Sequence, residues 1–189
     1  MSNDEITVLI TGDTHIPTRA KEIPKIMLSE IKRRGLYDYL LFTGDLVSNE
    51  VLDTISEWAN KVYVVRGNMD YLNLPNQVIL NIDKLRFGLI HGHQVYPRGD
   101  TLKLSRIAAK LQTDILVSGH THNPFIKEVN VRGSKVLLIN PGSLTGVWSG
   151  GFASMKPAFM IAYIKDREIV VELYELSYKL IRKRYEFTV

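Results

Sequence analysis

Short apolar runs rich in β-branched residues recur through the first third of the chain. Three of them predict strands buried on both faces, at residues 6–11 (ITVLIT), 38–44 (DYLLFTG) and 61–67 (KVYVVRG). Between these runs, apolar residues recur at helical spacing in 23–35 and 49–60, and Pro24 and Gly35 stand near the ends of the first segment. This βαβαβ order predicts a parallel sheet covered by helices.

Beyond this unit, a helix is predicted at 101–112, and strands are predicted at 77–82, 85–91 and 114–120. After Asn123 the pattern changes to strands joined by turns, which favours antiparallel pairing, at 124–131, 134–142, 158–166, 167–176 and 178–189. A parallel half followed by an antiparallel half predicts two sheets packed face to face with helices outside. The expected fold is therefore α/β, a four-layer αββα sandwich.

Composition narrows the class of protein. With 189 residues and 45% hydrophobic content, the chain is expected to form a single domain over residues 1–189. It has no cysteine, which excludes disulfides and thiolate metal sites. No apolar run approaches the roughly 18 residues that span a bilayer, so we expect a cytoplasmic protein without membrane insertion. The formal charge of +4 mildly favours anionic partners.

Potential metal ligands follow each of the best predicted strands. They include all five histidines of the chain, and the full set is Asp13, His15, Asp45, Asn68, Asp70, His91, His93, His120 and His122. Loops at the carboxyl ends of strands converge in open α/β sheets, so these side chains are expected to meet. Imidazole and carboxylate ligands without sulfur suit Mn, Fe(II), Zn, Co or Ni. Even without Asp70 and His93, the seven remaining candidate ligands exceed the needs of one four-coordinate ion, which predicts two ions.

The ordered motifs GDTH, GD, GNMD, HGH and GHTH resemble those of the calcineurin-like metallophosphoesterases. The stretches IHGHQVYPRGD, DILVSGHTHNPF and INPGSLTG further resemble the small retromer subunit and its prokaryotic phosphodiesterase relatives. The resemblance implies the metallo-dependent phosphatase fold, two mixed sheets flanked by helices, and two divalent ions, manganese before zinc, iron, cobalt or nickel. It implies one ion on Asp13, His15 and His122, another on Asn68, His91 and His120, and Asp45 between them.

The resemblance also bears on activity. The retromer subunit is regarded as a scaffold, and it carries Asn and Asp where this chain has Asp45 and Asn68, as active members do. We therefore expect a phosphodiesterase in which two ions, about 3.5–4 Å apart, activate a hydroxide. One alternative is an interaction module that binds a protein through an apolar patch drawn from Ile23, Trp148, Phe152 and Tyr174. A nuclease is the third hypothesis.

Met69 stands where many relatives have the histidine considered to protonate the leaving group. A thioether has no proton to give, so the expected substrates are small phosphodiesters with good leaving groups. Three roles stay open for His93, which are protonating the leaving group, contacting the phosphate and lining the cleft. Asp70 is expected either to orient a neighbouring ligand or to cap a turn.

Three further segments lie outside the ligand motifs. The loop at 142–157, rich in Gly and Ser, is expected to be functional, and Asn140–Ser143 before it to support the cleft. Arg98 is expected to be a solvated loop residue rather than a phosphate ligand. The basic segment 179–187 is expected to be a solvated edge strand rather than a nucleic-acid site.

Overall fold

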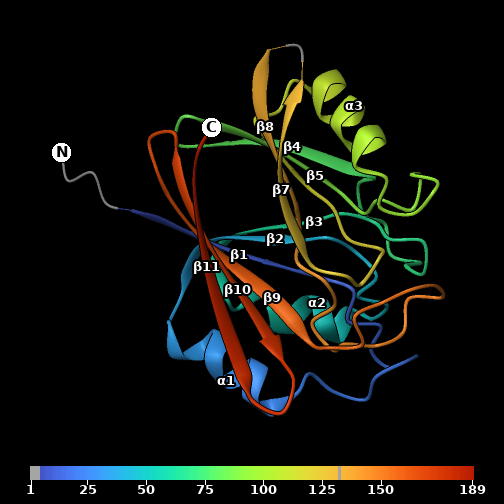
Figure 1. Ribbon diagram of the computed structural model, residues 1–189. Coiled ribbons are helices and arrows are strands. Elements are labelled where there is room, and N and C mark those ends of the chain that lie inside the picture. Colours follow the sequence, from blue (N-terminus) through green and yellow to red (C-terminus); the bar gives the residue numbers. More distant parts are fainter. Residues whose placement is uncertain (1–4, 132) are drawn as a thin grey trace.

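The computed structural model describes residues 5–131 and 133–189 (Figure 1). The helices are α1 (Lys25–Arg33), α2 (Asn49–Ser56) and α3 (Thr101–Leu111). The strands are β1 (Ile6–Thr11), β2 (Tyr37–Phe42), β3 (Ala59–Val64), β4 (Gln77–Ile82), β5 (Leu85–Ile90), β6 (Ile115–Val117), β7 (Phe125–Val131), β8 (Ser134–Asn140), β9 (Ala158–Lys165), β10 (Glu168–Leu176) and β11 (Leu180–Thr188). No helix within these residues is long and apolar enough to cross a bilayer.

The strands form two mixed sheets, with the orders β11-β10-β9-β1-β2-β3 and β4-β5-β6-β8-β7. The predicted division into a parallel and an antiparallel half is wrong in detail, because the halves of the chain do not correspond to the sheets. Strands β2 and β3 extend the first sheet to one side of β1, which leaves the other edge of β1 free to pair antiparallel with β9. In the second sheet, β8 pairs parallel with β6 and antiparallel with β7.

Four layers result from the burial of both sheets on both faces. Along β1, Val8 and Ile10 belong to the core between the sheets, whereas Leu9 packs under the helices on the outer face. This outer core receives Met27 of α1 and Ile55 of α2, and α3 covers the other sheet. Figure 1 shows α3 at the top, α1 and α2 at the bottom, and the sheets between them. The predicted αββα fold class is confirmed.

Most elements are somewhat shorter than predicted, and two of them bear on the site. Helix α2 ends at Ser56, because Trp58 turns into the outer core and Ala59 begins β3. Strand β6 ends at Val117, and the chain beyond it becomes a loop in which His120 has a φ of 67°. The residues after this short strand are therefore available to the site.

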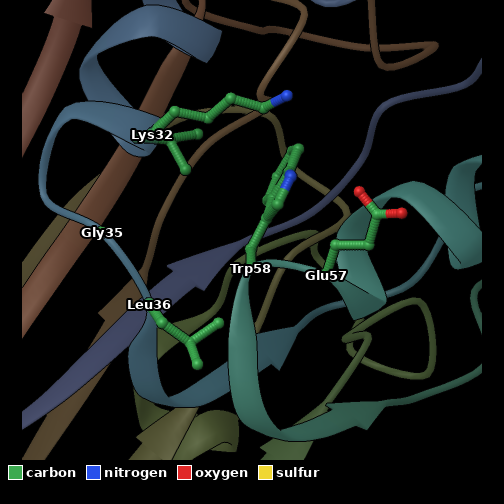
Figure 2. A pocket seen from close by; sticks show the side chains of 6 residues that line it. Lys32, Gly35, Leu36, Glu57 and Trp58 are labelled. Atoms are coloured by element: carbon green, nitrogen blue, oxygen red, sulfur yellow. The ribbon is translucent and has the colours of Figure 1, made fainter.

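A surface hollow lies between the carboxyl-terminal ends of α1 and α2 (Figure 2). Its volume is about 340 Å³, and its walls are formed by Ile31, Lys32, Gly35, Leu36, Glu57 and Trp58. The hollow lies where β2 and β3 begin, whereas the candidate ligands follow the ends of strands. It is therefore separate from the candidate metal centre.

Candidate metal centre

The loops that follow β1, β2, β5 and β6 bring the predicted ligands together at one edge of the molecule. Two groups of carboxylates and imidazoles have ligand atoms that all lie within 4.8 Å of one another. One group is Asp13, His15 and His122, and the other is Asp13, Asp45 and His91. All five of these side chains are buried. The convergence expected from the strand ends is therefore present.

In the first group, two imidazole nitrogens face each other. The Nε2 atoms of His15 and His122 are 3.1 Å apart, and His122 Nε2 lies 3.3 Å from Oδ1 of Asp13. His122 Nδ1 lies 2.7 Å from the carbonyl oxygen of Val147, where it can only donate. In the neutral ring this bond leaves the lone pair of Nε2 pointing into the group.

The second group is arranged around His91. Its Nδ1 lies 2.7 Å from the carbonyl oxygen of Thr43, and its Nε2 lies 3.1 Å from Oδ1 of Asn68 and 3.4 Å from Oδ2 of Asp45. That same oxygen of Asp45 is 3.4 Å from Nε2 of His15. A single oxygen of Asp45 is thus equally far from an imidazole of each group.

Two further histidines border the second group. The His120 ring is half-buried, with its centroid 5.0 Å from that of His91, and it belongs to neither compact group of the described residues. The His93 ring is exposed, with its centroid 5.5 Å from that of His91 and 6.3 Å from that of His120. His93 therefore lies at the rim of the site, at the end away from His15.

Burial and charge divide the imidazoles of the metal-free protein. Burial lowers the pKa of His15 to about 4, and burial together with the charges of His91 and Arg98 lowers the pKa of His120 to about 4. Burial also opposes the charged form of His91, but the Asp45 hydrogen bond and nearby carboxylate charges raise its pKa to about 9. His15 and His120 are therefore neutral at pH 7, whereas His91 carries a proton that metal binding would displace.

Asp45 is held as a carboxylate. Burial favours its neutral form, but hydrogen bonds from His91 and from the backbone N–H of Met69 lower its pKa to about 2. The Met69 bond measures 2.8 Å to Oδ1 of Asp45. Met69 therefore contributes a backbone donor to the site, while its thioether is 40% exposed.

The backbone around the ligands is in a conformation that side chains rarely adopt. Five site residues have positive φ angles between 49° and 67°, namely Asp13, His15, Asp45, His120 and His122. Val47, close behind Asp45, has a φ of 74°, which is unusual for a β-branched residue. Such conformations cost of order 1–3 kcal/mol each and persist only where surrounding contacts impose them.

Glycines make room for the carboxylates. A Cβ atom on Gly67 would lie 2.0 Å from Oδ1 of Asp45, and one on Gly119 would lie 2.4 Å from Oδ2 of Asp13. Both distances are far shorter than atoms tolerate, so these two positions require glycine for the carboxylates to keep their places. The glycines that precede Asn68 and His120 are therefore part of how the site is built.

Asp70 contacts the backbone rather than the centre of the site. Its Oδ2 accepts hydrogen bonds from the N–H groups of Asp45 and Gly67, each 2.8 Å long, and its Oδ1 accepts one of 2.9 Å from Val47. The carboxylate is 4% exposed. Of the two roles expected for Asp70, these contacts favour orienting a neighbouring candidate ligand.

Hydrogen bonds to backbone carbonyl oxygens connect the end of β8 and the loop after it to the site. Asn140 Nδ2 donates to the carbonyl oxygen of Gly119 at 2.8 Å, and Ser143 Oγ donates to that of Asp13 at 2.6 Å. Half-buried Arg98 donates from Nη2 to the carbonyl oxygens of His120, at 2.6 Å, and Ser149, at 2.9 Å. Arg98 is therefore a tether between two loops, not the solvated residue that was predicted.

One residue of the site carried no distinguishing sequence pattern. Thr43 donates from Oγ1 to Oδ2 of Asp13 at 3.1 Å, and its carbonyl oxygen accepts from His91. A threonine directly after a buried strand is common, and only its position before Gly44 and Asp45 pointed toward the cleft. Its importance appears only when the loops are seen together.

The predicted apolar patch is confirmed only in part as a surface feature, whereas the predicted basic edge strand is present. Tyr174 is 2% exposed and packs in the core beneath α1, so its prediction as part of an apolar patch is wrong. Ile23 is half-buried against the same core, whereas Trp148 and Phe152 are 57% and 86% exposed. The basic segment forms edge strand β11, and its Arg182, Lys183 and Arg184 lie within ion-pair distance of Glu172, Glu175 and Glu186.

The side chains present fit divalent cations. His91 donates from Nε2 toward Oδ2 of Asp45, where a metal ion could take the place of the proton, and the Nε2 atoms of His15 and His122 face each other in a buried space. Acceptors directed at acceptors are unfavourable unless a proton or a metal ion lies between them. The backbone carbonyls on the far nitrogens of His91 and His122 are the partners that metal-binding histidines usually have.

Fold and site together define the class of metal-dependent phosphoesterases. A family model described as the calcineurin-like phosphoesterase superfamily domain matches residues 6–167, and the chain belongs to this superfamily. The chain is 45% identical over 136 residues to the probable metallophosphoesterase of Methanocaldococcus jannaschii, an alignment that covers 72% of this chain and 67% of that protein. The family resemblance predicted from the motifs is confirmed.

Two solved structures show the relationship along nearly the whole chain. Vacuolar protein sorting 29 of Cryptosporidium parvum is 30% identical, with a TM-score of 0.88 over 98% of this chain and 99% of that one. Wild-type vacuolar protein sorting 29 of Entamoeba histolytica, solved in complex with Zn²⁺, is 34% identical, with a TM-score of 0.86 over 96% of this chain and 99% of that one. The chain is therefore similar both to a probable enzyme and to sorting proteins.

Proposed function

We propose that this protein is a metal-dependent phosphodiesterase that uses two divalent ions. The observation that carries the proposal is the position of Asp45, whose Oδ2 atom lies 3.4 Å from an imidazole nitrogen of His15 and 3.4 Å from one of His91. A carboxylate oxygen between two sets of imidazoles is suited to bridging two cations. Manganese is the first choice of metal, because nitrogen and oxygen ligands without sulfur accommodate it, and zinc, iron, cobalt and nickel are the alternatives.

The proposed ligands fall into two sets. As the family resemblance implies, His15, His122 and Asp13 would hold one ion, His91, His120 and Asn68 would hold the other, and Asp45 would be shared. Two such ions supply Lewis-acid stabilisation of the phosphoryl oxygens and an activated water nucleophile. His15 is held by burial, and His91 and Asp45 are held by burial and by hydrogen bonds to the backbone, so these residues are oriented before substrate arrives.

Few side chains at the border of the candidate metal centre could protonate a leaving group. Met69 has a thioether where an imidazole would serve as acid, and only its backbone N–H reaches the site. His93, exposed beside His91, is the remaining imidazole that could donate a proton or contact the phosphate. We therefore propose diesters with good leaving groups as the preferred substrates, because these need little proton transfer.

The test is hydrolysis of bis(p-nitrophenyl) phosphate by protein of measured metal content. Wild type is expected to turn over with manganese and to stop with chelator, and Asp45→Asn is expected to lose at least about 100-fold in kcat/KM. Asp53→Asn is the matched control, since Asp53 is an exposed carboxylate on α2. Absence of turnover with every one of the five metals would contradict the proposal.

A second candidate function is protein binding near the cleft. It is favoured by the exposed side chains of Trp148 and Phe152 and by the similarity to vacuolar protein sorting 29. This function predicts a partner whose affinity falls on Trp148→Ala and Phe152→Ala but not on Asp45→Asn. If the protein hydrolyses the diester and no such partner binds to it, the protein-binding function is refuted and the phosphodiesterase function remains.

A further inference from the structure

The loop at 142–157 places the backbone of Trp148 next to the residues of the candidate metal centre. Three successive carbonyl oxygens of this loop accept hydrogen bonds from residues at the site. Val147 is bonded by Nδ1 of His122 at 2.7 Å, Trp148 by Nη1 of Arg19 at 2.8 Å, and Ser149 by Nη2 of Arg98 at 2.9 Å. The backbone of Trp148 is therefore fixed on both sides and at its own carbonyl.

These bonds connect Trp148 to one end of the site. Arg19 donates its backbone N–H to the carbonyl oxygen of His15 at 2.8 Å, so its guanidinium links Trp148 to the turn that carries His15. Val147, directly before Trp148, contacts His122. Trp148 thus lies at the end formed by His15 and His122, whereas His93 borders the end formed by His91 and His120.

The indole of Trp148 is available to a ligand. The side chain is 57% exposed, and no aromatic ring of the described residues stacks against it. The next residues are Ser149, Gly150 and Gly151, which have a small side chain or none. A fixed backbone beneath an exposed aromatic ring is the arrangement that binds planar groups by stacking, because little conformational freedom is lost.

We propose that Trp148 forms a subsite for the planar aromatic arm of the substrate, and that nucleoside phosphodiesters are the preferred substrate class. The inference rests on the proposed phosphodiesterase function, since the phosphate must lie on the neighbouring ligands. Arg19 adds a positive charge at the same rim, since its backbone N–H is bonded to the carbonyl oxygen of His15 at 2.8 Å. A nucleoside arm presents both a stacking face and a phosphate, which together match the indole and the cationic rim.

Binding of a product analogue tests the subsite without turnover. The chain has two tryptophans, so Trp58→Phe leaves Trp148 as the reporter of indole fluorescence. In manganese-loaded Trp58→Phe protein, thymidine 5′-monophosphate is expected to quench this fluorescence saturably, and methyl phosphate, of equal charge, is expected to leave it unchanged. An excess of methyl phosphate should reverse the quenching, because both compounds need the same phosphate position. Quenching that methyl phosphate cannot reverse would overturn the inference.

Calorimetry on the metal-loaded protein gives the energetic test. Wild type is expected to bind thymidine 5′-monophosphate about 10-fold more tightly than methyl phosphate, the low end of the range for stacking one base on an aromatic ring. Trp148→Ala should reduce this ratio to about 1, and Phe152→Ala, which removes the more exposed aromatic of the same loop, should keep it. Equal affinities in wild type, or an unchanged ratio in Trp148→Ala, would overturn the proposal.

The two proposals fail in different ways. A preference for the nucleotide without hydrolysis of bis(p-nitrophenyl) phosphate would refute the phosphodiesterase and support the planar subsite. Hydrolysis without that preference would refute the subsite and leave the phosphodiesterase intact. When both hold, kcat/KM for thymidine 5′-(p-nitrophenyl) phosphate should exceed that for methyl p-nitrophenyl phosphate, and Trp148→Ala should narrow the difference.

Discussion

Asp70 controls the shape of the site without pointing into it, so Asp70→Asn is an informative perturbation. The carboxylate accepts three backbone hydrogen bonds, two on Oδ2 from Asp45 and Gly67 and one on Oδ1 from Val47. Asparagine has the same shape but only one accepting oxygen. Its amide group must therefore face at least one backbone N–H as a second donor.

The size of the effect follows from these contacts. If the asparagine oxygen takes the place of Oδ2, two charge-assisted bonds become neutral, which costs about 1 kcal/mol each. The N–H of Val47 is then left opposite an amide donor in a buried place, which costs about 1–3 kcal/mol more. The sum predicts a loss of about 3–5 kcal/mol in the free energy of unfolding. Because Asp45 is held by the same group, metal affinity should fall about 10- to 100-fold.

Two measurements on the same preparations separate the contributions. Urea unfolding in chelator reports stability, and manganese titration of the folded protein reports metal affinity. Asp38→Asn is the matched control. Asp38 lies at the start of β2, away from the candidate ligands, and its Oδ2 accepts two hydrogen bonds of 2.8 Å, from the backbone N–H and the hydroxyl of Thr7. The control should lose stability and keep its metal affinity. If Asp70→Asn lost stability but bound manganese as wild type does, the role assigned to Asp70 would be refuted.

Three further predictions concern other residues of the site. Gly67→Ala should reduce manganese affinity and turnover at least about 10-fold by displacing Asp45. Gly35→Ala is the control, because Gly35 is also a loop glycine but a Cβ there would meet no atom within 4 Å, and it should change neither manganese affinity nor turnover. Met69→His should raise kcat for alkyl leaving groups up to about 100-fold and flatten the dependence of rate on leaving-group pKa. An unchanged dependence would argue against a missing acid. In chelator, stability should fall as pH drops from 6.5 to 4, because unfolded protein takes up protons that folded His15 and His120, each with a pKa of about 4, do not. Buried His15 should account for about 3 kcal/mol of this fall, so urea unfolding of His15→Gln should show a smaller slope in this window.

Local pattern was sufficient for much of the fold. Strand β1 could be predicted because both of its faces are buried and every residue from Ile6 to Ile10 is apolar or β-branched. The pairing of β1 with β9 could not, because it joins residues about 150 positions apart through main-chain bonds that leave no mark on the sequence. The same limit explains why Tyr174 was expected at the surface, since nothing near it in the chain shows that α1 covers its ring.

The candidate ligands were predictable for a different reason. Asp13 and His15 follow β1 of one sheet and His91 follows β5 of the other, and the loops beyond the carboxyl ends of such strands are where ligands are expected to converge. Their supports were not predictable, because Thr43 acts through its carbonyl and hydroxyl, and Arg98 acts through carbonyls that any sequence would supply. Sequence patterns therefore identified the candidate ligands better than the residues that support them.

The supports matter because the site is strained without them. Asp45 and Val47 both have positive φ angles, at a cost of order 1–3 kcal/mol each. Three hydrogen bonds to the Asp70 carboxylate contribute about 1.5–3 kcal/mol each and act on the backbone of these two residues and of Gly67. The stabilisation therefore matches or exceeds the strain, and it acts in the absence of any ion. The arrangement of Asp45 between His15 and His91 is consequently a property of the folded chain, so an ion binding at the proposed site would meet oriented side chains and would not have to assemble them.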